Sequence, residues 1–315
     1  MKMNSKDERF FESWLERRKS RLAEGTYSSE QSATTALKEF LEVEGVGLAD
    51  IDFLLADNFI SYLTNEKGLA DNTTVNYYSK VKQLYEYYIK VNKLDKTNPF
   101  PEVDVSHLDY ESPDNEKITL EEEEVRALVE SMTEARSKAL FGFMATTGAR
   151  IGEAIRLEMD DLDLQERSAT IITLKNDNQD ERTVYFDRRA RRYLNEYVNN
   201  GYRSQYPNDD SEYVFITRVA ERMSRDRGRV LFNDGVENCE EIEDKVDTNE
   251  KAGGNERSTI TSHILRRSYA QNWIDSGGDI MTLKNVMGWS DLETAKQYLN
   301  DEVDKDKVDR YGMTL

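Results

Sequence analysis

An aperiodic stretch at residues 99–117 constrains this chain more than any other feature, because it holds three of the four prolines. Proline lacks a backbone N–H and interrupts helices, so the segments on either side must build separate cores. With 315 residues, the chain is long enough for two domains of ordinary size. The sequence therefore predicts a first domain at residues 1–100, a linker at 101–117 and a second domain at 118–315.

Apolar residues of the first domain recur at helical spacing. They do so over residues 36–41 and 55–63, and a longer apolar stripe covers residues 78–89. Asn72 or Thr73 is the predicted N-cap of the helix that carries this stripe. We therefore expect a helical first domain.

The second domain combines helices with short strands. Thr119 and Glu122 form a capping-box pattern, and a further helix is predicted from 135 to 147. β-strand patterns at residues 169–174 and 183–186 flank a polar turn. The predicted fold class is thus mainly α with a small antiparallel β-sheet.

Composition excludes several classes of protein. Cys239 is the only cysteine and there are two histidines, so neither an intrachain disulfide nor a zinc centre is expected. The first residues, MKMNSKDERFFESW, lack an apolar signal core, and no stretch approaches the roughly 18 apolar residues of a membrane-spanning helix. We therefore expect a cytoplasmic protein with no metal and no membrane partner.

The net charge of −19 is unfavourable for binding nucleic acid, since phosphate binders are usually basic. At about 1 M salt, however, the Debye length falls to roughly 3 Å, and repulsion between distant charges is screened. The acidic composition therefore suggests adaptation to a high-salt cytoplasm, such as that of a halophilic archaeon. The alternative is a merely acidic protein from an ordinary cytoplasm.

Two segments place an arginine beside a residue suited to phosphate chemistry. A glycine turn precedes Arg150, whose planar guanidinium suits two phosphate oxygens, and Glu153 lies three residues further on. His263 and Arg266 share one face of a predicted helix. Taken singly, such an Arg/Glu pair is usually a solvated surface contact and such a histidine is usually structural.

Two further segments contain a candidate tyrosine and a candidate lysine. Tyr298 follows Trp289 by nine residues, and Lys175 lies at the tip of the predicted hairpin. With 17 tyrosines in the chain, any one of them is ordinarily a packing residue. Trp289 alone is typical of a core, and a hairpin lysine is typically a solvated charge.

The order of these segments resembles the tyrosine recombinases, the phage-integrase family. The resemblance rests on Thr147-Gly148-Ala149-Arg150-x-x-Glu153, on His263-x-Leu265-Arg266-Arg267, and on Met287-Gly288-Trp289-Ser290 with Tyr298 beyond it. Residues 27–99 also resemble the helical core-binding domain of that family, so the likeness covers essentially the whole chain. It implies a helical core-binding domain followed by an α+β catalytic domain.

Two features depart from the family pattern. Many members have histidine at the position of Trp289, although tryptophan also occurs there and keeps one N–H donor. Residues 234–256 are acidic, contain two adjacent glycines and lack periodicity, so we expect an inserted loop.

The resemblance implies a role for each candidate residue. Arg150 and Arg266 neutralise the phosphate oxygens with help from Trp289, and Glu153 supports Arg150. Tyr298 attacks the phosphate, His263 accepts its proton, and Lys175 protonates the departing 5′ oxygen. No cofactor is implied.

The resemblance also implies partners. These are double-stranded DNA with inverted-repeat core sites and three further copies of the chain, with a tail at residues 301–315 packing on a neighbouring protomer. Local basic residues are the candidate DNA contacts: Arg188, Arg189, Arg191, Arg192, Arg218, Arg222, Arg225 and Arg267. For the group from Arg218 to Arg229, an exposed arginine-rich helix paired with nearby acids is the alternative.

Three other functions remain open at this point. A catalytically silent DNA-binding relative would keep the fold, and a type IB topoisomerase would share the chemistry. An acidic helical interaction protein would bind no DNA.

Overall fold

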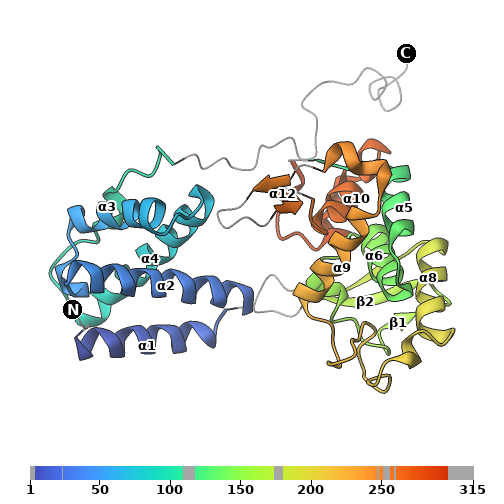
Figure 1. The fold of residues 1–315 in the computed structure, drawn as a ribbon, viewed down its shortest axis with the longest axis horizontal. Coiled ribbons are helices and arrows are strands. Elements are labelled where there is room, and N and C mark those ends of the chain that lie inside the picture. The colour runs from blue at the N-terminus through green and yellow to red at the C-terminus, as the bar shows by residue number, and fades with distance from the viewer. Residues whose placement is uncertain are drawn as a thin grey trace, which may run out of the picture. The chain divides into compact units, whose positions relative to one another are not determined.

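The computed structural model describes residues 4–22, 24–108, 118–173, 180–246, 248–250, 256–258 and 260–296. The chain divides into two compact units, residues 1–116 and 117–315 (Figure 1). Each unit has its own apolar core. The fold is mainly helical with a small antiparallel sheet, which confirms the predicted fold class.

The first unit is built from helices. They are α1 Ser5–Lys19, α2 Glu24–Glu44, α3 Phe53–Ser61 and α4 Asp71–Asn92, with short helical turns at Leu48–Asp50, Tyr62–Glu66 and Phe100–Glu102. Tyr85 of α4 is buried, and its hydroxyl donates to the carbonyl oxygens of Leu48 and Ile51 at 3.0 and 3.1 Å. These bonds satisfy a buried phenol and fasten α4 to the segment before α3.

The predicted N-cap of α4 is wrong by two or three residues. The helix begins at Asp71 after Ala70, whose carbonyl accepts the backbone N–H groups of Thr73 and Thr74 at 2.9 and 3.0 Å. Asn72 and Thr73 therefore lie within the first turn. Asp71 in that turn complements the helix dipole, which accounts for a start without a side-chain cap.

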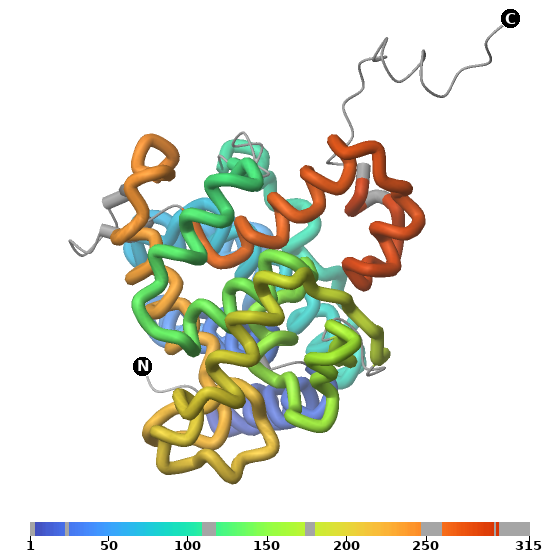
Figure 2. The backbone as a smooth tube through the Cα atoms, turned by 90° about the vertical axis from the view of Figure 1, so that its right-hand side faces the viewer, coloured from blue at the N-terminus to red at the C-terminus, as the bar shows by residue number. Residues whose placement is uncertain are grey.

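The second unit surrounds one buried helix. Its helices are α5 Glu122–Ser131, α6 Ala135–Thr147, α7 Ile151–Ala154, α8 Arg188–Asn199, α9 Arg225–Glu237, α10 His263–Asp275, α11 Ile280–Met287 and α12 Glu293–Lys296. Helix α6 has the predicted bounds and is buried on nearly all sides by α5, α8 and α10. Figure 2 shows α10 running beside α5.

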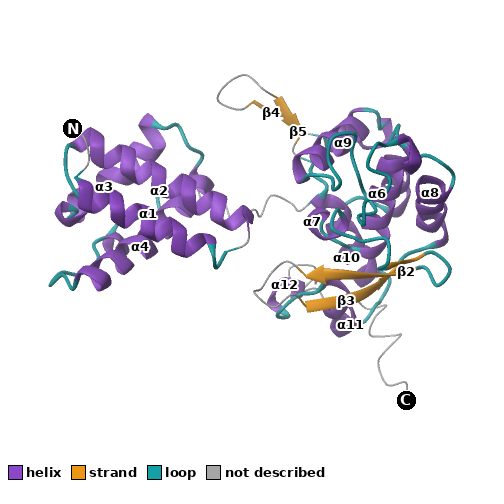
Figure 3. Cartoon of the chain, turned by 90° about the horizontal axis from the view of Figure 1, so that it is seen from below, coloured by secondary structure: helices purple, strands orange, loops and turns teal. Residues whose placement is uncertain are grey.

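The main sheet has the strand order β1-β2-β3, all antiparallel, in the described part of the chain. Its strands are β1 Leu162–Asp163, β2 Ser168–Thr173 and β3 Asp180–Tyr185. β3 lies against α11 (Figure 3). β2 and β3 match the predicted strands within a few residues, whereas the two-residue β1 was not predicted because its pattern is too short to detect.

The predicted capping box of α5 is also wrong. Glu121 is the N-cap, and its backbone N–H donates to the carboxylate of Glu124 at 2.7 Å. Leu120 is held outside the helix because its N–H donates to the buried Ser268 hydroxyl at 2.8 Å. A contact with α10, far along the chain, therefore sets this boundary.

The described part of residues 234–256 is not the loop that the sequence predicted. Helix α9 continues to Glu237, a 3-10 helix covers Glu240–Lys245, and the strands Thr248–Glu250 and Glu256–Ser258 pair with each other. Cys239 and Ile242 are buried in the main core. Isolated buried residues such as these produce no periodic pattern in the sequence.

The described helices include none that combines the length and apolar character needed to cross a membrane. The described residues likewise contain no cluster of three or more His, Cys, Asp or Glu side chains that could hold a metal ion.

Candidate active site

Two glycines with left-handed backbone angles, Gly148 and Gly288, position the segments that carry Arg150 and Trp289. Gly148, with φ of +66°, ends α6, so that Arg150 follows as the N-cap of α7. Gly288, with φ of +60°, ends α11 immediately before Trp289. A Cβ at Gly148 would lie 2.6 Å from the Met287 sulfur and 2.9 Å from the Tyr269 ring. Glycine is thus required at Gly148 both for its backbone angle and for the close approach of α10 and α11.

The structure brings three predicted catalytic residues to one cavity. Arg150, His263 and Arg266 line a hollow of about 320 Å³, together with Arg225 and Gly152. His263 is the first residue of α10 and Arg266 lies one turn further along, so both face the α6–α7 junction. Three cationic side chains and one imidazole therefore surround a space that suits an anion.

Glu153 holds Arg150 in place. Its carboxylate accepts both the Arg150 backbone N–H and the Arg150 Nη1 at 2.9 Å, and the carboxylate has no solvent exposure. Burial alone raises the pKa of the Glu153 carboxyl, but the hydrogen bonds and charges of Arg182 and Arg150 outweigh burial and lower the pKa below its ordinary value. Glu153 therefore stays ionised and fixes the Arg150 guanidinium at the cavity.

Arg182 is a residue of this site that the sequence analysis missed. Its Nη2 lies 2.7 Å from the Glu153 carboxylate, and its Nε donates to the carbonyl of Val286 at 3.0 Å. In the sequence, Arg182 is an ordinary charged residue in an alternating strand pattern. Its proximity to Glu153 arises only when β3 packs beside α7 and α11.

Arg266 is almost completely buried, with 2% of its surface exposed. Its guanidinium donates to the carbonyl oxygens of Gly148 and Met287 at 2.5 and 2.6 Å. These bonds fix the plane of the guanidinium at the cavity wall and join the turns that precede Arg150 and Trp289. Arg266 is therefore rigidly positioned at the meeting point of the three motifs.

The imidazole of His263 is neutral at neutral pH. Its pKa is lowered to about 4, mainly because surrounding protein atoms desolvate the ring. The positive charges of Arg266, Arg267 and Arg150 lower the pKa further. The residue is nonetheless exposed to solvent. A neutral, accessible imidazole beside two arginines can accept a proton at neutral pH.

Trp289 is buried in a small apolar cluster with Leu283, Met287 and Ala295. The Arg266 guanidinium carbon lies 5.9 Å from the centre of its ring, within range of a cation–π contact. The structure therefore places Trp289 next to Arg266. The predicted nucleophile Tyr298 and the predicted acid Lys175 both lie outside the described residues.

The predicted DNA-contacting arginines occupy different environments. Arg188, Arg191 and Arg192 are exposed on α8, whereas Arg189 forms an ion pair with Glu130 at 3.3 Å. Arg267 on α10 is half-buried.

The arginines from Arg218 to Arg229 are only partly helical, contrary to the single helix considered from the sequence. Arg218 and Arg222 precede α9 and lie against the rings of Tyr206 and Tyr213. Within α9, Arg227 and Arg229 form ion pairs with Glu134 and Asp226 at 3.8 and 3.4 Å. Arg225 forms no ion pair with a described carboxylate and lines the arginine–histidine cavity instead.

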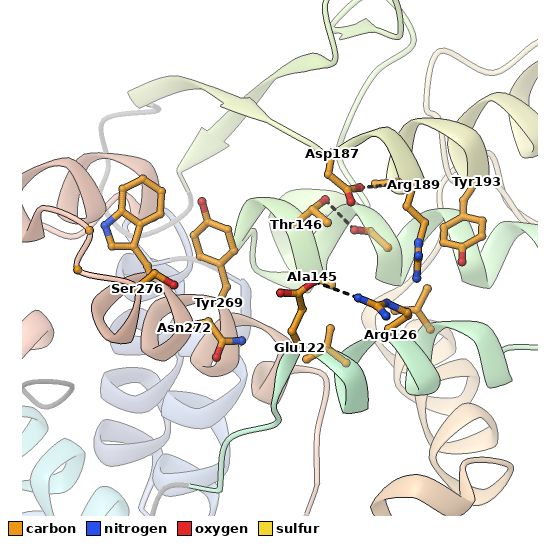
Figure 4. Close-up of a pocket in the computed structure, with 17 residues that line it drawn as sticks. Glu122, Arg126, Ala145, Thr146, Asp187, Arg189, Tyr193, Tyr269, Asn272 and Ser276 are labelled. Atoms are coloured by element: carbon orange, nitrogen blue, oxygen red, sulfur yellow. Dashed lines mark hydrogen bonds and ion pairs between the residues drawn. The ribbon is translucent and has the colours of Figure 1, made fainter.

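A second cavity, of about 610 Å³, lies elsewhere in this unit. It is lined by α10 on one side and by α5, α6 and α8 on the other (Figure 4). Its walls include Val125, Ala145, Tyr193 and Tyr269, and the Glu122–Arg126 ion pair borders it. None of the predicted catalytic residues in the described part of the chain lines this cavity, so it is separate from the arginine–histidine site.

Comparison with known proteins assigns both units to one family. Residues 119–305 match the model of the phage integrase family, and residues 9–106 match that of the phage integrase SAM-like domain. The tyrosine recombinase XerC of Leptospira interrogans is 24% identical over 274 residues, which cover 86% of this chain and 80% of XerC.

Two solved structures share the fold. The Tn1549 transposon integrase in complex with transposon right end DNA has a TM-score of 0.71 at 16% identity, and the match covers 97% of this chain and 99% of that one. A lambda integrase dimer bound to a core site has a TM-score of 0.67 at 13% identity, with 95% and 98% coverage. Since the family model matches more than half of the chain, this protein belongs to the phage integrase family of tyrosine recombinases.

Proposed function

We propose that this protein is a site-specific DNA recombinase that cleaves and rejoins strands through a phosphotyrosine at Tyr298. The Tyr298 hydroxyl attacks a phosphodiester, a bond forms between its oxygen and phosphorus, and the bond to the 5′ oxygen breaks. The products are a 3′-phosphotyrosine and a free 5′ hydroxyl. The observation that carries the proposal is the single cavity in which Arg150, His263 and Arg266 meet.

Each described residue has a role that its surroundings support. Arg150, held by Glu153, and Arg266, held by two carbonyls, stabilise the negative charge that develops on the non-bridging oxygens. His263, neutral because of its lowered pKa, accepts the tyrosine proton. Trp289 contributes an indole N–H beside Arg266.

Lys175 completes the proposed mechanism by protonating the leaving 5′ oxygen. The phosphotyrosine conserves the energy of the broken bond, so a 5′ hydroxyl of a second duplex can reverse the step. Strand exchange then requires neither a nucleotide nor a metal ion.

DNA binding by a chain of charge −19 requires basic residues that are not neutralised within the fold. Arg225 meets this condition, because it lines the cavity without a described carboxylate partner. Arg188, Arg191 and Arg192 are exposed on α8 and extend the proposed contact surface, with Arg218, Arg222 and Arg267 as further candidates. Arg189 is partly neutralised by Glu130 and contributes less.

The proposed assembly has four protomers on two inverted-repeat sites, with a Holliday junction as the intermediate. The domains of each protomer, at residues 1–100 and 118–315, hold the DNA between them. The tail at residues 301–315, which lies outside the described residues, contacts a neighbouring protomer.

Covalent capture on a nicked suicide substrate tests the proposed function. The nick lets a short fragment diffuse away after cleavage, so the protein remains attached to DNA. Mass spectrometry of the trapped peptide should find the DNA on Tyr298. Tyr298→Phe removes one oxygen and little volume, so DNA affinity should persist while capture disappears.

Other outcomes would overturn this assignment. DNA attached to Tyr311, or to any residue other than Tyr298, excludes the proposed nucleophile. Binding without capture indicates a catalytically silent relative, and relaxation without junction formation indicates a topoisomerase.

A further inference from the structure

Arg182 joins three elements around the candidate active site. From β3, its Nη1 donates to the Thr173 hydroxyl of β2 at 2.7 Å, and its Nε donates to the carbonyl of Val286 on α11 at 3.0 Å. Nη2 and Nη1 also contact the two carboxylate oxygens of Glu153 on α7, at 2.7 and 3.4 Å. The guanidinium thus binds Glu153 through both nitrogens and is held on its other sides by the fold.

Arg182 does not line the arginine–histidine cavity. Its side chain is 11% exposed, compared with 28% for Arg150, and the Glu153 carboxylate between them is fully buried. Any effect of Arg182 on a ligand in the cavity must therefore be indirect, and Glu153 links it directly to Arg150.

The charges of the three residues indicate what this arrangement achieves. Glu153 with Arg150 alone would be a neutral pair, and the carboxylate would cancel much of the positive potential at the cavity. With Arg182 on its other side, the cluster carries one net positive charge. Because Arg150 lines the cavity and Arg182 does not, Arg150 presents this excess charge to the cavity.

Arg182 also contacts the turn before Trp289. A Cβ at Gly288 would lie 2.9 Å from the Arg182 Nη1, and the Val286 carbonyl that accepts from Nε precedes this turn. One guanidinium therefore keeps the Arg150 segment and the Trp289 segment at a fixed separation.

We propose that Arg182 is a positioning residue for DNA cleavage that compensates the charge of Glu153 and so leaves the charge of Arg150 available to the phosphate. This inference rests on the proposed function. It adds a residue that does not line the cavity and that acts on the phosphate through the Glu153–Arg150 pair.

The test compares single-turnover cleavage of a nicked substrate by the wild-type protein, Arg182→Gln and Arg182→Lys. Arg182→Gln should slow cleavage by roughly 10²-fold, because a distant substitution that displaces a catalytic group slightly has an effect of that order. Its DNA affinity should stay near that of the wild type. Arg182→Lys keeps the charge but not the two-pronged contact, so its rate should be intermediate. Arg126→Gln, which removes a partly exposed cation paired with Glu122, is the matched control and should cleave normally.

A methylphosphonate at the scissile position distinguishes this role from a structural one. Replacing one non-bridging oxygen by methyl removes the negative charge, so cleavage depends less on Arg150. The deficit of Arg182→Gln should shrink on this substrate, in parallel with that of Arg150→Ala. A deficit that stays equally large on methylphosphonate would overturn the inference.

A substrate with sulfur at the 5′ bridging position tests the competing route through Lys175. A thiolate leaves without protonation, so this substrate restores cleavage only in a variant that fails to protonate the leaving group. Rescue of Arg182→Gln by sulfur would show that Arg182 acts through the hairpin, and would contradict the inference.

The double variant Glu153→Gln/Arg182→Gln removes the buried carboxylate together with Arg182 and leaves the net charge of the cluster unchanged, so it remains usable if Arg182→Gln unfolds. It should cleave faster than Arg182→Gln, or, if that variant does not fold, form the covalent complex at a measurable rate. A double variant without this activity refutes charge compensation.

If the wild-type protein itself forms no covalent complex, the proposed function fails. If the wild type forms it and Arg182→Gln cleaves at the same rate, only this inference fails.

Discussion

The two units of the molecule use buried charge differently. In the described part of the first unit, the buried carboxylates of Asp7 and Glu30 serve the fold. Asp7 accepts the backbone N–H of Leu48 at 2.9 Å, which ties α1 to the segment before α3. Glu30 on α2 pairs with Arg18 at 3.3 Å and with Lys80 at 3.9 Å, which links it to α1 and α4. Asp7 thus binds neutral N–H donors and Glu30 binds two cations, all within the helical unit.

In the second unit, the group of charges around Glu153 borders a cavity and has a positive excess. Arg150 and Arg182 share the carboxylate of Glu153, and Arg266 donates to the backbone carbonyls of Gly148 and Met287. The comparison shows that burial of a charged residue is not by itself a sign of function. The informative feature is an excess of one sign next to a space that a ligand can enter.

The largest expected effect on stability comes from the apolar core of the first unit. Phe59 is fully buried between the rings of Phe40 and Phe100, so Phe59→Ala should lower the free energy of unfolding by about 3–5 kcal/mol. Phe53 on the same helix is 48% exposed, and Phe53→Ala should cost only about 0.5 kcal/mol. Denaturant unfolding followed by circular dichroism measures both. Equal losses would show that this core does not stabilise the first unit.

Arg150→Ala should instead affect chemistry. Removing its charge should slow cleavage roughly 10²–10³-fold while DNA affinity and stability stay near those of the wild type. Arg136 is the matched structural arginine, since it is 4% exposed and donates to the carbonyl of Ile216 at 2.8 Å. Arg136→Ala should lower stability by about 1–3 kcal/mol and spare the chemical step in molecules that remain folded. If the two variants exchange these effects, the distinction between the two kinds of buried charge is wrong.

The lowered pKa of His263 predicts an unusual titration. Its imidazole should titrate near pH 4 instead of near 6.5, so the neutral base is present throughout the neutral range. Because the folded-state pKa lies below the unfolded one, this residue's contribution to stability is lost as pH falls from about 6.5 to about 4. NMR of a His107→Gln variant, which leaves His263 as the only histidine, measures the value directly. Titration near 6.5 in the free protein would remove the support for a neutral acceptor.

The smallest expected effect comes from ionic strength. If the charge of −19 reflects adaptation to high salt, the melting temperature should be higher at about 2 M than at about 0.1 M KCl, because screening reduces surface repulsion. Thermal melts of the wild-type protein and of Arg150→Ala should rise alike, since the Glu153 cluster is buried and poorly screened. A flat salt dependence would refute the high-salt adaptation without affecting the enzymatic proposal.

The sequence by itself determined the fold class, the bounds of α6 and the identity of the residues that meet in the cavity. These features depend on local patterns: apolar periodicity, a glycine that ends a helix, and short motifs in a fixed order. Gly148 illustrates the reason, because both its backbone angle and the end of α6 depend on the residues directly around it.

Only the tertiary structure decided which charges compensate one another. Arg182 resembles any strand arginine until β3 packs beside α7 and brings it to Glu153. Arg225, Arg227 and Arg229 lie close together in the sequence, yet the last two form ion pairs and Arg225 lines the cavity. Electrostatic interaction depends on distance in space and on access of water, and neither quantity is encoded in the spacing of residues along the chain.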